Sequence, residues 1–165
     1  MQKVTLLLGS NAPEAEALVG KATDILGIAV GTIQSISHDH RSAAYGFTSE
    51  REFVNRAVVL ATEHDAYEVL RRINLIEALL GRDRTEEQRV KSAMGEAYAS
   101  RPIDIDIIFY GTMTFNDERL TIPYHFLDQR EYALRPVVDV MAEFQHPDLA
   151  ETPRAMLEAL TRNLE

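Results

Sequence analysis

The sequence has no cysteine among its 165 residues. A disulfide framework, a thiolate metal site and a cysteine nucleophile are therefore excluded. No apolar run approaches the roughly 20 residues needed to span a bilayer. The apolar stretch near the N-terminus stops at Gly9, which is too soon for a signal peptide. We therefore expect a cytoplasmic protein with no membrane partner.

Positive charge and glycine-rich phosphate loops are also scarce. Lys and Arg total 17 against 26 Asp and Glu, which gives a formal net charge of −9. Because nucleic-acid binding normally uses a basic face, we expect small-molecule partners and no nucleic acid. Neither Gly-x-x-x-x-Gly-Lys-Ser/Thr nor Gly-x-Gly-x-x-Gly occurs. The phosphates of any bound nucleotide would then be held by side chains and a metal.

The hydrophobic content of 45%, without a repeat or linker, predicts one domain over residues 1–165. Strands are predicted at Lys3–Leu8, within Val30–Ser37, and at Phe53–Ala61, Ile103–Tyr110 and Glu118–Ile122, with an irregular stretch from His38 to Glu52. The first predicted helix is capped by Asn11 and ends at Leu26, and the second follows a capping box that starts at Asp65. Two more are predicted near the C-terminus: one within Asp128–Met141, interrupted by Pro136, and one over Thr152–Asn163. This order is typical of an α+β, ferredoxin-like βαββαβ fold with additional C-terminal helices. Helices would cover one face of the antiparallel sheet and leave the other to a ligand.

The motif Ile-Asp-Ile-Asp-Ile at residues 103–107 places two aspartates on one strand. Alternate strand residues share a face, so Asp104 and Asp106 point the same way, about 7 Å apart at Cβ, and the isoleucines point into the core. Neighbouring carboxylates repel each other unless a cation lies between them. Magnesium suits the pair, because it is usually held by one or two carboxylates plus substrate phosphates. The alternative is an edge strand whose polar face is only solvated.

Arginines precede and follow this pair, at Arg82, Arg84, Arg89, Arg101, Arg119 and Arg130. Guanidinium groups bind phosphate oxygens bidentately and stay charged. The polar stretch over residues 82–101 has no clear period, which is typical of a functional lid or a disordered insertion. It can equally be a solvated face, since acidic residues partly neutralise it.

Phe53 and Asn55 share a strand face and offer a flat heterocycle a stacking surface and an amide partner. An aromatic residue at a strand start is also common in a core, so that alternative stays open. The five histidines form no recognisable metal spacing. We interpret them as loop or surface residues, with His125 set apart below.

In order and spacing, the motifs together resemble those of one family. They are Leu-Leu-Leu-Gly-Ser-Asn at 6–11, Phe53-Val-Asn55, the Ile-Glu…Gly-Arg-x-Arg run at 76–84, Arg-x-Ile-Asp-Ile-Asp-Ile at 101–107, Leu-Thr-Ile-Pro at 120–123, Arg130, and His-Pro-Asp at 146–148. The sequence is similar, from about Val4 to Asp148, to the hydroxymethyldihydropterin pyrophosphokinases of folate biosynthesis.

The resemblance implies an ATP- and Mg²⁺-dependent enzyme that transfers diphosphate to 6-hydroxymethyl-7,8-dihydropterin and releases AMP. It implies that Asp104 and Asp106 bind two Mg²⁺ ions at the ATP phosphates, and that Arg82 and Arg101 are catalytic arginines. The nucleotide would contact Asn74, Glu77, Arg84, the Ile107 backbone, Arg119, Thr121, His125 and Arg130. The pterin would lie between Phe53 and Tyr132, with Asn55 and the backbone from Ser42 to Tyr45 at its polar edge. Which aspartate accepts the hydroxyl proton stays open.

Three departures from the family pattern are visible. Arg41 is followed by Ser-Ala-Ala-Tyr-Gly instead of Thr-Pro, and Tyr98 stands where the family has a tryptophan. The family's Pro-His pair is Pro123-Tyr124-His125 here, so His125 is a candidate shifted by one position. Whether Tyr124 or His125 contacts phosphate stays open.

Two other hypotheses remain beside the enzyme. One is a non-catalytic or substrate-shifted relative that binds pterin or nucleotide, and the other is a regulatory ferredoxin-like domain that binds a metabolite between subunits. The retained aspartates, with Arg82 and Arg101, favour the enzyme, which we expect to be a monomer. Arg101→Ala is predicted to lower turnover far more than ATP affinity.

Overall fold

The computed structural model describes residues 1–43, 52–83, 85, 89 and 102–162. Its main sheet is antiparallel, in the order β2-β4-β1-β5, with a short β3 paired to β4. The strands are β1 (Gln2–Ser10), β2 (Thr32–Ile36), β3 (His40–Ser42), β4 (Phe53–Thr62) and β5 (Asp104–Tyr110). A separate hairpin joins β6 (Phe115–Asn116) to β7 (Thr121–Ile122). The chain order and the sheet order together confirm the predicted ferredoxin-like fold.

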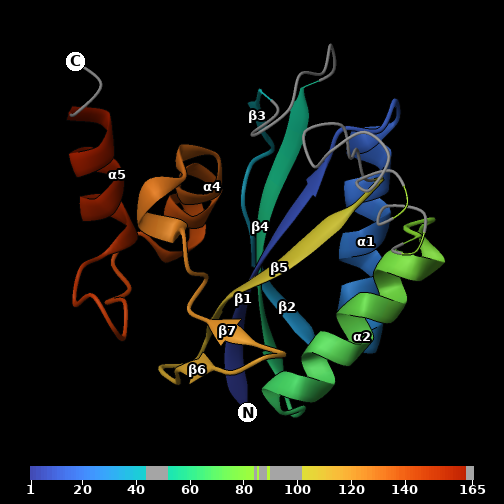
Figure 1. The fold of residues 1–165 in the computed structure, drawn as a ribbon, viewed down its shortest axis with the longest axis horizontal. Helices are drawn as coiled ribbons and strands as arrows, with labels where there is room; N and C mark the ends of the chain where they lie inside the picture. The colour runs from blue at the N-terminus through green and yellow to red at the C-terminus, as the bar shows by residue number, and fades with distance from the viewer. Residues whose placement is uncertain (44–51, 84, 86–88, 90–101, 163–165) are drawn as a thin grey trace.

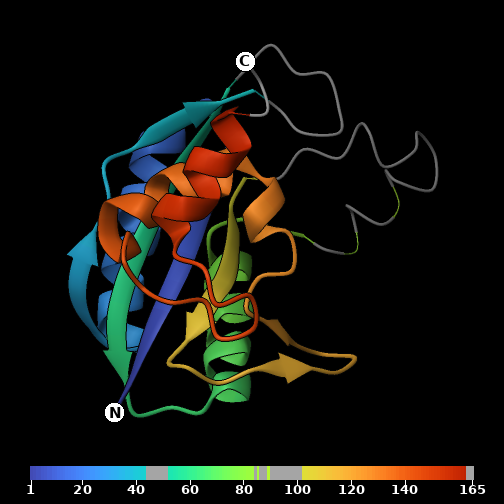
Figure 2. The ribbon, with the colours of Figure 1, turned by 90° about the vertical axis from the view of Figure 1, so that its left-hand side faces the viewer.

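Helices lie on both sides of the sheet (Figure 1). One layer contains α1 (Ala15–Ala29) and α2 (Ala66–Leu79). The other contains α4 (Glu131–Met141) and α5 (Pro153–Arg162), with the short 3-10 helix η2 (Leu127–Gln129) before α4. The turned view in Figure 2 shows the C-terminal pair in front of the strands.

The alternation of apolar residues along β1 accounts for both layers. Val4, Leu6 and Leu8 are fully buried in the core under α1 and α2, whereas Leu7 belongs to the core under α4 and α5. Successive strand residues point to opposite faces, so a strand that is apolar throughout requires cover on both sides. The expectation that the second face is left to a ligand is therefore only partly correct, because the C-terminal helices occupy much of it.

Several local predictions need correction. Helix α1 begins at Ala15, so its N-cap residue is Glu14 and not the predicted Asn11. The Glu14 side chain makes no capping hydrogen bond. The helix also continues past Gly27 to Ala29. Helix α4 runs through Pro136 without interruption, although this buried proline lies in the middle of the helix and removes one intrahelical hydrogen bond. Strand β3 lies inside the stretch that was expected to be irregular.

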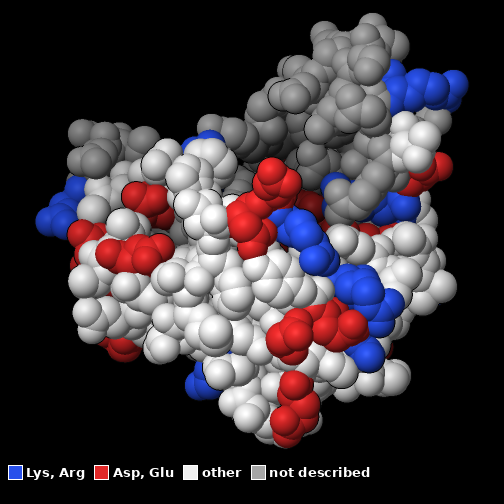
Figure 3. Space-filling view, turned by 60° about the horizontal axis from the view of Figure 1, so that its bottom comes forward, with Lys and Arg blue, Asp and Glu red and all other residues white. Residues whose placement is uncertain are grey.

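No helix in the described part of the chain is long and apolar enough to cross a membrane. On the face shown in Figure 3, acidic and basic side chains lie beside one another, and neither sign forms an extended patch.

Candidate active site

The two aspartates of β5 lie on the sheet face that points toward α4. The isoleucines at 103, 105 and 107 are buried in the opposite core, as the strand pattern predicts. Asp104 pairs with Gly9 of β1, and the Asp104 side chain is 31% exposed. The Ser10 hydroxyl donates to the Pro102 carbonyl, which fastens the end of β1 to the residue pair before β5. The acidic pair is thus carried by a strand that is fixed to the centre of the sheet.

The end of α2 turns the chain back toward β5. Gly81 has a φ of +101°, a left-handed conformation that glycine adopts without steric cost. The Gly81 amide donates to the Ala78 carbonyl at 3.1 Å and the Arg82 amide to the Glu77 carbonyl at 3.0 Å. These two bonds form a Schellman motif, and the turn directs the Arg82 side chain toward the strand.

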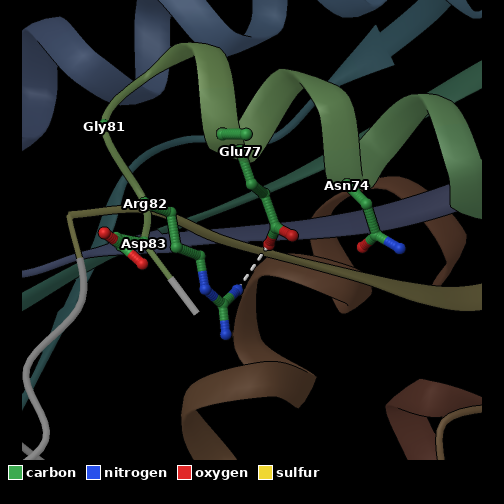
Figure 4. A pocket seen from close by; sticks show the side chains of 6 residues that line it. Asn74, Glu77, Gly81, Arg82 and Asp83 are labelled. Carbon is green, nitrogen blue, oxygen red and sulfur yellow. Dashed lines mark hydrogen bonds and ion pairs between the residues drawn. The ribbon is translucent and has the colours of Figure 1, made fainter. Parts of the chain in front are cut away.

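A buried network joins α2 to β5, and Figure 4 shows its bond between Arg82 and Glu77. Arg82 Nη1 donates to Glu77 Oε2 at 2.7 Å and to Asp104 Oδ1 at 2.8 Å. The same Glu77 oxygen accepts the backbone amide of Ile105, which lies between the two aspartates, at 2.8 Å. The side chains of Glu77 and Arg82 are only 1% and 5% exposed. Arg82 is therefore held between two carboxylates, and Asp104 has a cation beside it.

Figure 4 also shows Asn74 and Glu77 projecting from the same side of α2. With Ala78, Gly81, Arg82 and Asp83 they line a hollow of about 490 Å³. Two of the predicted nucleotide residues and one predicted catalytic arginine thus border a single space. Asn74 itself is exposed.

Three of the predicted pterin residues, Ser42, Phe53 and Asn55, lie together at the start of β4. Asn55 is almost fully buried and in register with both His40 of β3 and Gly9 of β1. Its Nδ2 donates to the Ser42 hydroxyl at 2.8 Å and to the His40 carbonyl at 3.4 Å. A Cβ at Gly9 would lie 3.3 Å from Asn55 Oδ1, so glycine leaves room for the amide. Phe53 pairs with Ser42.

Two tyrosines lie near the acidic pair: Tyr124, in the segment after β7, and Tyr132, in the first turn of α4. The hydroxyls of Tyr124 and Tyr132 are 3.2 Å apart. Burial is the largest cause that raises the pKa of both phenols, and the charges of Asp106 and Asp104 raise each further. Both tyrosines are therefore neutral hydrogen-bonding groups at neutral pH. Sequence reasoning assigned Tyr132 to the pterin and left open whether Tyr124 or His125 contacts phosphate, but it did not predict that the two tyrosines meet.

The remaining predicted residues lie around this centre or outside the described part. Arg119 is exposed, with its guanidinium carbon 5.1 Å from the Tyr67 ring centroid, and Thr121 is exposed on β7. Arg130 lies 4.7 Å from the Phe126 ring centroid. His125 is exposed and its ring packs against Phe126. Tyr45, Arg84 and Arg101 lie outside the described residues, and Ile107 is buried in β5 beside Leu6.

The acidic pair satisfies the requirements of magnesium. The cation takes oxygen ligands and usually keeps several waters, so one or two carboxylates with substrate phosphates suffice. A carboxylate has about four acceptor positions, so the bond from Arg82 leaves Asp104 able to ligate. Among the described residues there is no cluster of three or more His, Cys, Asp or Glu side chains that could hold a metal.

Fold and site together define a class: a ferredoxin-like α+β domain with paired carboxylates on one sheet face and a buried arginine, from the end of α2, beside one of them. Comparison with known proteins makes this specific. The family model for 7,8-dihydro-6-hydroxymethylpterin-pyrophosphokinase matches residues 5–142. The chain belongs to this family.

Relatives and solved structures agree with this assignment. The chain is 32% identical over 154 residues to the 2-amino-4-hydroxy-6-hydroxymethyldihydropteridine pyrophosphokinase of Porphyromonas gingivalis, covering 93% of this chain and 99% of that protein. The identity to the Methylorubrum extorquens protein of the same name is 32% over 163 residues, covering 98% and 94%. The wild-type HPPK-DHPS of Plasmodium falciparum has a similar fold, with a TM-score of 0.75 at 15% identity. That match covers 99% of this chain but 42% of the longer protein.

Proposed function

We propose that the sheet face bearing Asp104 and Asp106 is where this chain transfers the diphosphoryl group of ATP to 6-hydroxymethyl-7,8-dihydropterin, with AMP as the second product. The transfer is the reaction of the family, and it belongs to folate biosynthesis. One observation carries the assignment of the place: a buried arginine lies beside a partly exposed aspartate that shares its strand face with a second one. Diphosphoryl transfer needs such a concentration of fixed charges next to the reacting phosphates.

We assign Mg²⁺ to Asp104 and Asp106, with two ions as the family resemblance implies. When bound, magnesium would neutralise charge on the phosphate oxygens and orient them. The carboxylates themselves would fix the position of that charge along β5. Arg82, held by Glu77, would keep a permanent positive charge beside Asp104.

The other side chains are proposed to bind and orient the two substrates. Asn74, Glu77, Arg119, Thr121 and the Ile107 backbone would hold the nucleotide, with Arg84, His125 and Arg130 at the phosphates and Arg101 acting on them. Phe53 and Tyr132 would enclose the pterin ring, with Asn55, Ser42 and Tyr45 at its polar edge. Orientation of the hydroxymethyl oxygen toward the β-phosphorus is the main contribution expected of them.

The test is AMP release from ATP and magnesium with and without the pterin, with mass detection of the pterin diphosphate. Asp104→Asn and Asp106→Asn should each abolish turnover while thermal unfolding shows a folded protein. Asp24→Asn is the matched control, because Asp24 is exposed on α1 in the other helical layer. Near-normal turnover in either site variant would refute the metal assignment. Binding of pterin or ATP without product would indicate the non-catalytic or substrate-shifted relative.

A further inference from the structure

The contact between the Tyr124 and Tyr132 hydroxyls is not explained by the proposed function. Stacking on a pterin requires the Tyr132 ring, but it does not require a hydroxyl. Tyr124 is not among the substrate contacts of the proposed function. Yet the two hydroxyls meet at 3.2 Å, and both lie close enough to Asp104 and Asp106 for those charges to raise their pKa.

The two tyrosines come from segments that are anchored independently. The Tyr124 backbone amide donates to the Ile108 carbonyl at 3.0 Å, two residues beyond Asp106 on the same strand. Tyr132 lies in the first turn of α4, which packs on the sheet through the fully buried Ala133 and Leu134. The hydroxyl contact therefore connects the strand of the carboxylates to the helix that carries the stacking ring.

The protonation of the pair keeps this connection intact. Two neutral hydroxyls can form a hydrogen bond in which one donates and the other accepts. Because burial and the nearby carboxylates disfavour either phenolate, the pair stays neutral across the physiological range. The Tyr132 side chain is thus held at its hydroxyl by the hydrogen bond with Tyr124 and at its Cα by the backbone of α4.

We propose that Tyr124 is a positioning residue for the pterin: its hydroxyl fixes the Tyr132 ring in the orientation that stacks on the substrate. The inference rests on the proposed function, in which Tyr132 encloses the pterin. A ring that is already fixed in the free protein loses no conformational entropy when the pterin binds. A single neutral hydrogen bond changes an equilibrium by roughly two- to tenfold, and the effect should appear in pterin affinity.

The experiment compares Tyr124→Phe, Tyr132→Phe and the double variant. The measurements are the pterin dissociation constant by calorimetry and the KM for ATP. Each single variant should weaken pterin binding roughly two- to tenfold and leave the KM for ATP unchanged. The double variant should be no weaker than either single one, because both remove the same bond.

Tyr110→Phe is the matched control. It also removes one partly buried tyrosine hydrogen bond, at 2.6 Å to the His64 carbonyl, away from the acidic pair. It should lower the unfolding temperature without changing pterin affinity, which separates positioning from general stability.

Unchanged pterin affinity in Tyr124→Phe, additive losses in the double variant, or a change confined to the KM for ATP would each overturn the proposal. The wild-type protein distinguishes this failure from failure of the proposed function. Wild type that binds no pterin and releases no pterin-dependent AMP overturns both, whereas an active wild type with an unaffected variant overturns only the role of Tyr124.

Discussion

Replacing Glu77 by alanine is predicted to be strongly destabilising. The substitution removes the acceptor of the Ile105 amide, and an orphaned buried amide costs about 1–3 kcal/mol. It also removes one of the two carboxylates that hold Arg82, whose side chain is 5% exposed. Breaking a buried ion pair by removing one partner typically costs about 3–5 kcal/mol in total. Asp104 still contacts the guanidinium, so we expect the lower end of that range.

The assay is thermal and urea-induced unfolding. For a domain of this size, about 3 kcal/mol corresponds to a fall in melting temperature of about 6–12 °C. Glu77→Gln keeps a side-chain oxygen for the Ile105 amide and should cost only about 1 kcal/mol. Glu143→Ala is the control, since Glu143 is 71% exposed in its ion pair with Arg154 and should change stability by less than about 1 kcal/mol. A Glu77→Ala loss no larger than that of the control would refute the reasoning.

Three further predictions concern single positions. Gly81→Ala should cost about 1 kcal/mol in unfolding free energy, because alanine resists a φ of +101°; an unchanged melting temperature would contradict this. Gly9→Ala places a methyl 3.3 Å from Asn55 Oδ1 and should weaken pterin binding by about 1–3 kcal/mol in calorimetry, whereas unaltered binding would show that the amide can shift. Burial lowers the pKa of His146 below its usual 6.5, so the unfolded chain binds the proton more readily and stability should fall as the pH drops below about 6.5. In a plot of unfolding free energy against pH, His146→Asn should show a smaller fall below a pH of about 6.5 than the wild type. Identical falls in the two proteins would contradict the assignment of this pH dependence to His146.

The sequence predicted those helices and strands whose local residue pattern alone specifies them. The aspartates on β5 alternate with isoleucines, so the strand pattern alone determines which side chains share a face. The Asp65 cap on α2 is confirmed by its bond to the Glu68 amide. By contrast, β3 has only three residues and depends on pairing with β4, which no local pattern encodes.

The sequence nominated site residues, whose roles stay predictions, but it could not predict the contacts between them. The motifs indicated Arg82 as a phosphate-binding residue, but they could not reveal its bonds to Glu77 and Asp104, which depend on how α2 ends. The glycine after that helix was a visible stop signal, yet the direction of the next side chain follows from tertiary packing. The contact between the Tyr124 and Tyr132 hydroxyls was likewise not predicted, because the two residues come from different elements.

The Glu77 carboxylate also affects how copies of this chain can meet. Strand β5 ends the sheet, and an open strand edge is a template for pairing with another chain. Glu77 caps the Ile105 amide there, and the Tyr124 amide occupies the Ile108 carbonyl. These two bonds occupy backbone groups that an incoming strand would need, so the β5 edge beside the carboxylates is partly protected from pairing with another chain.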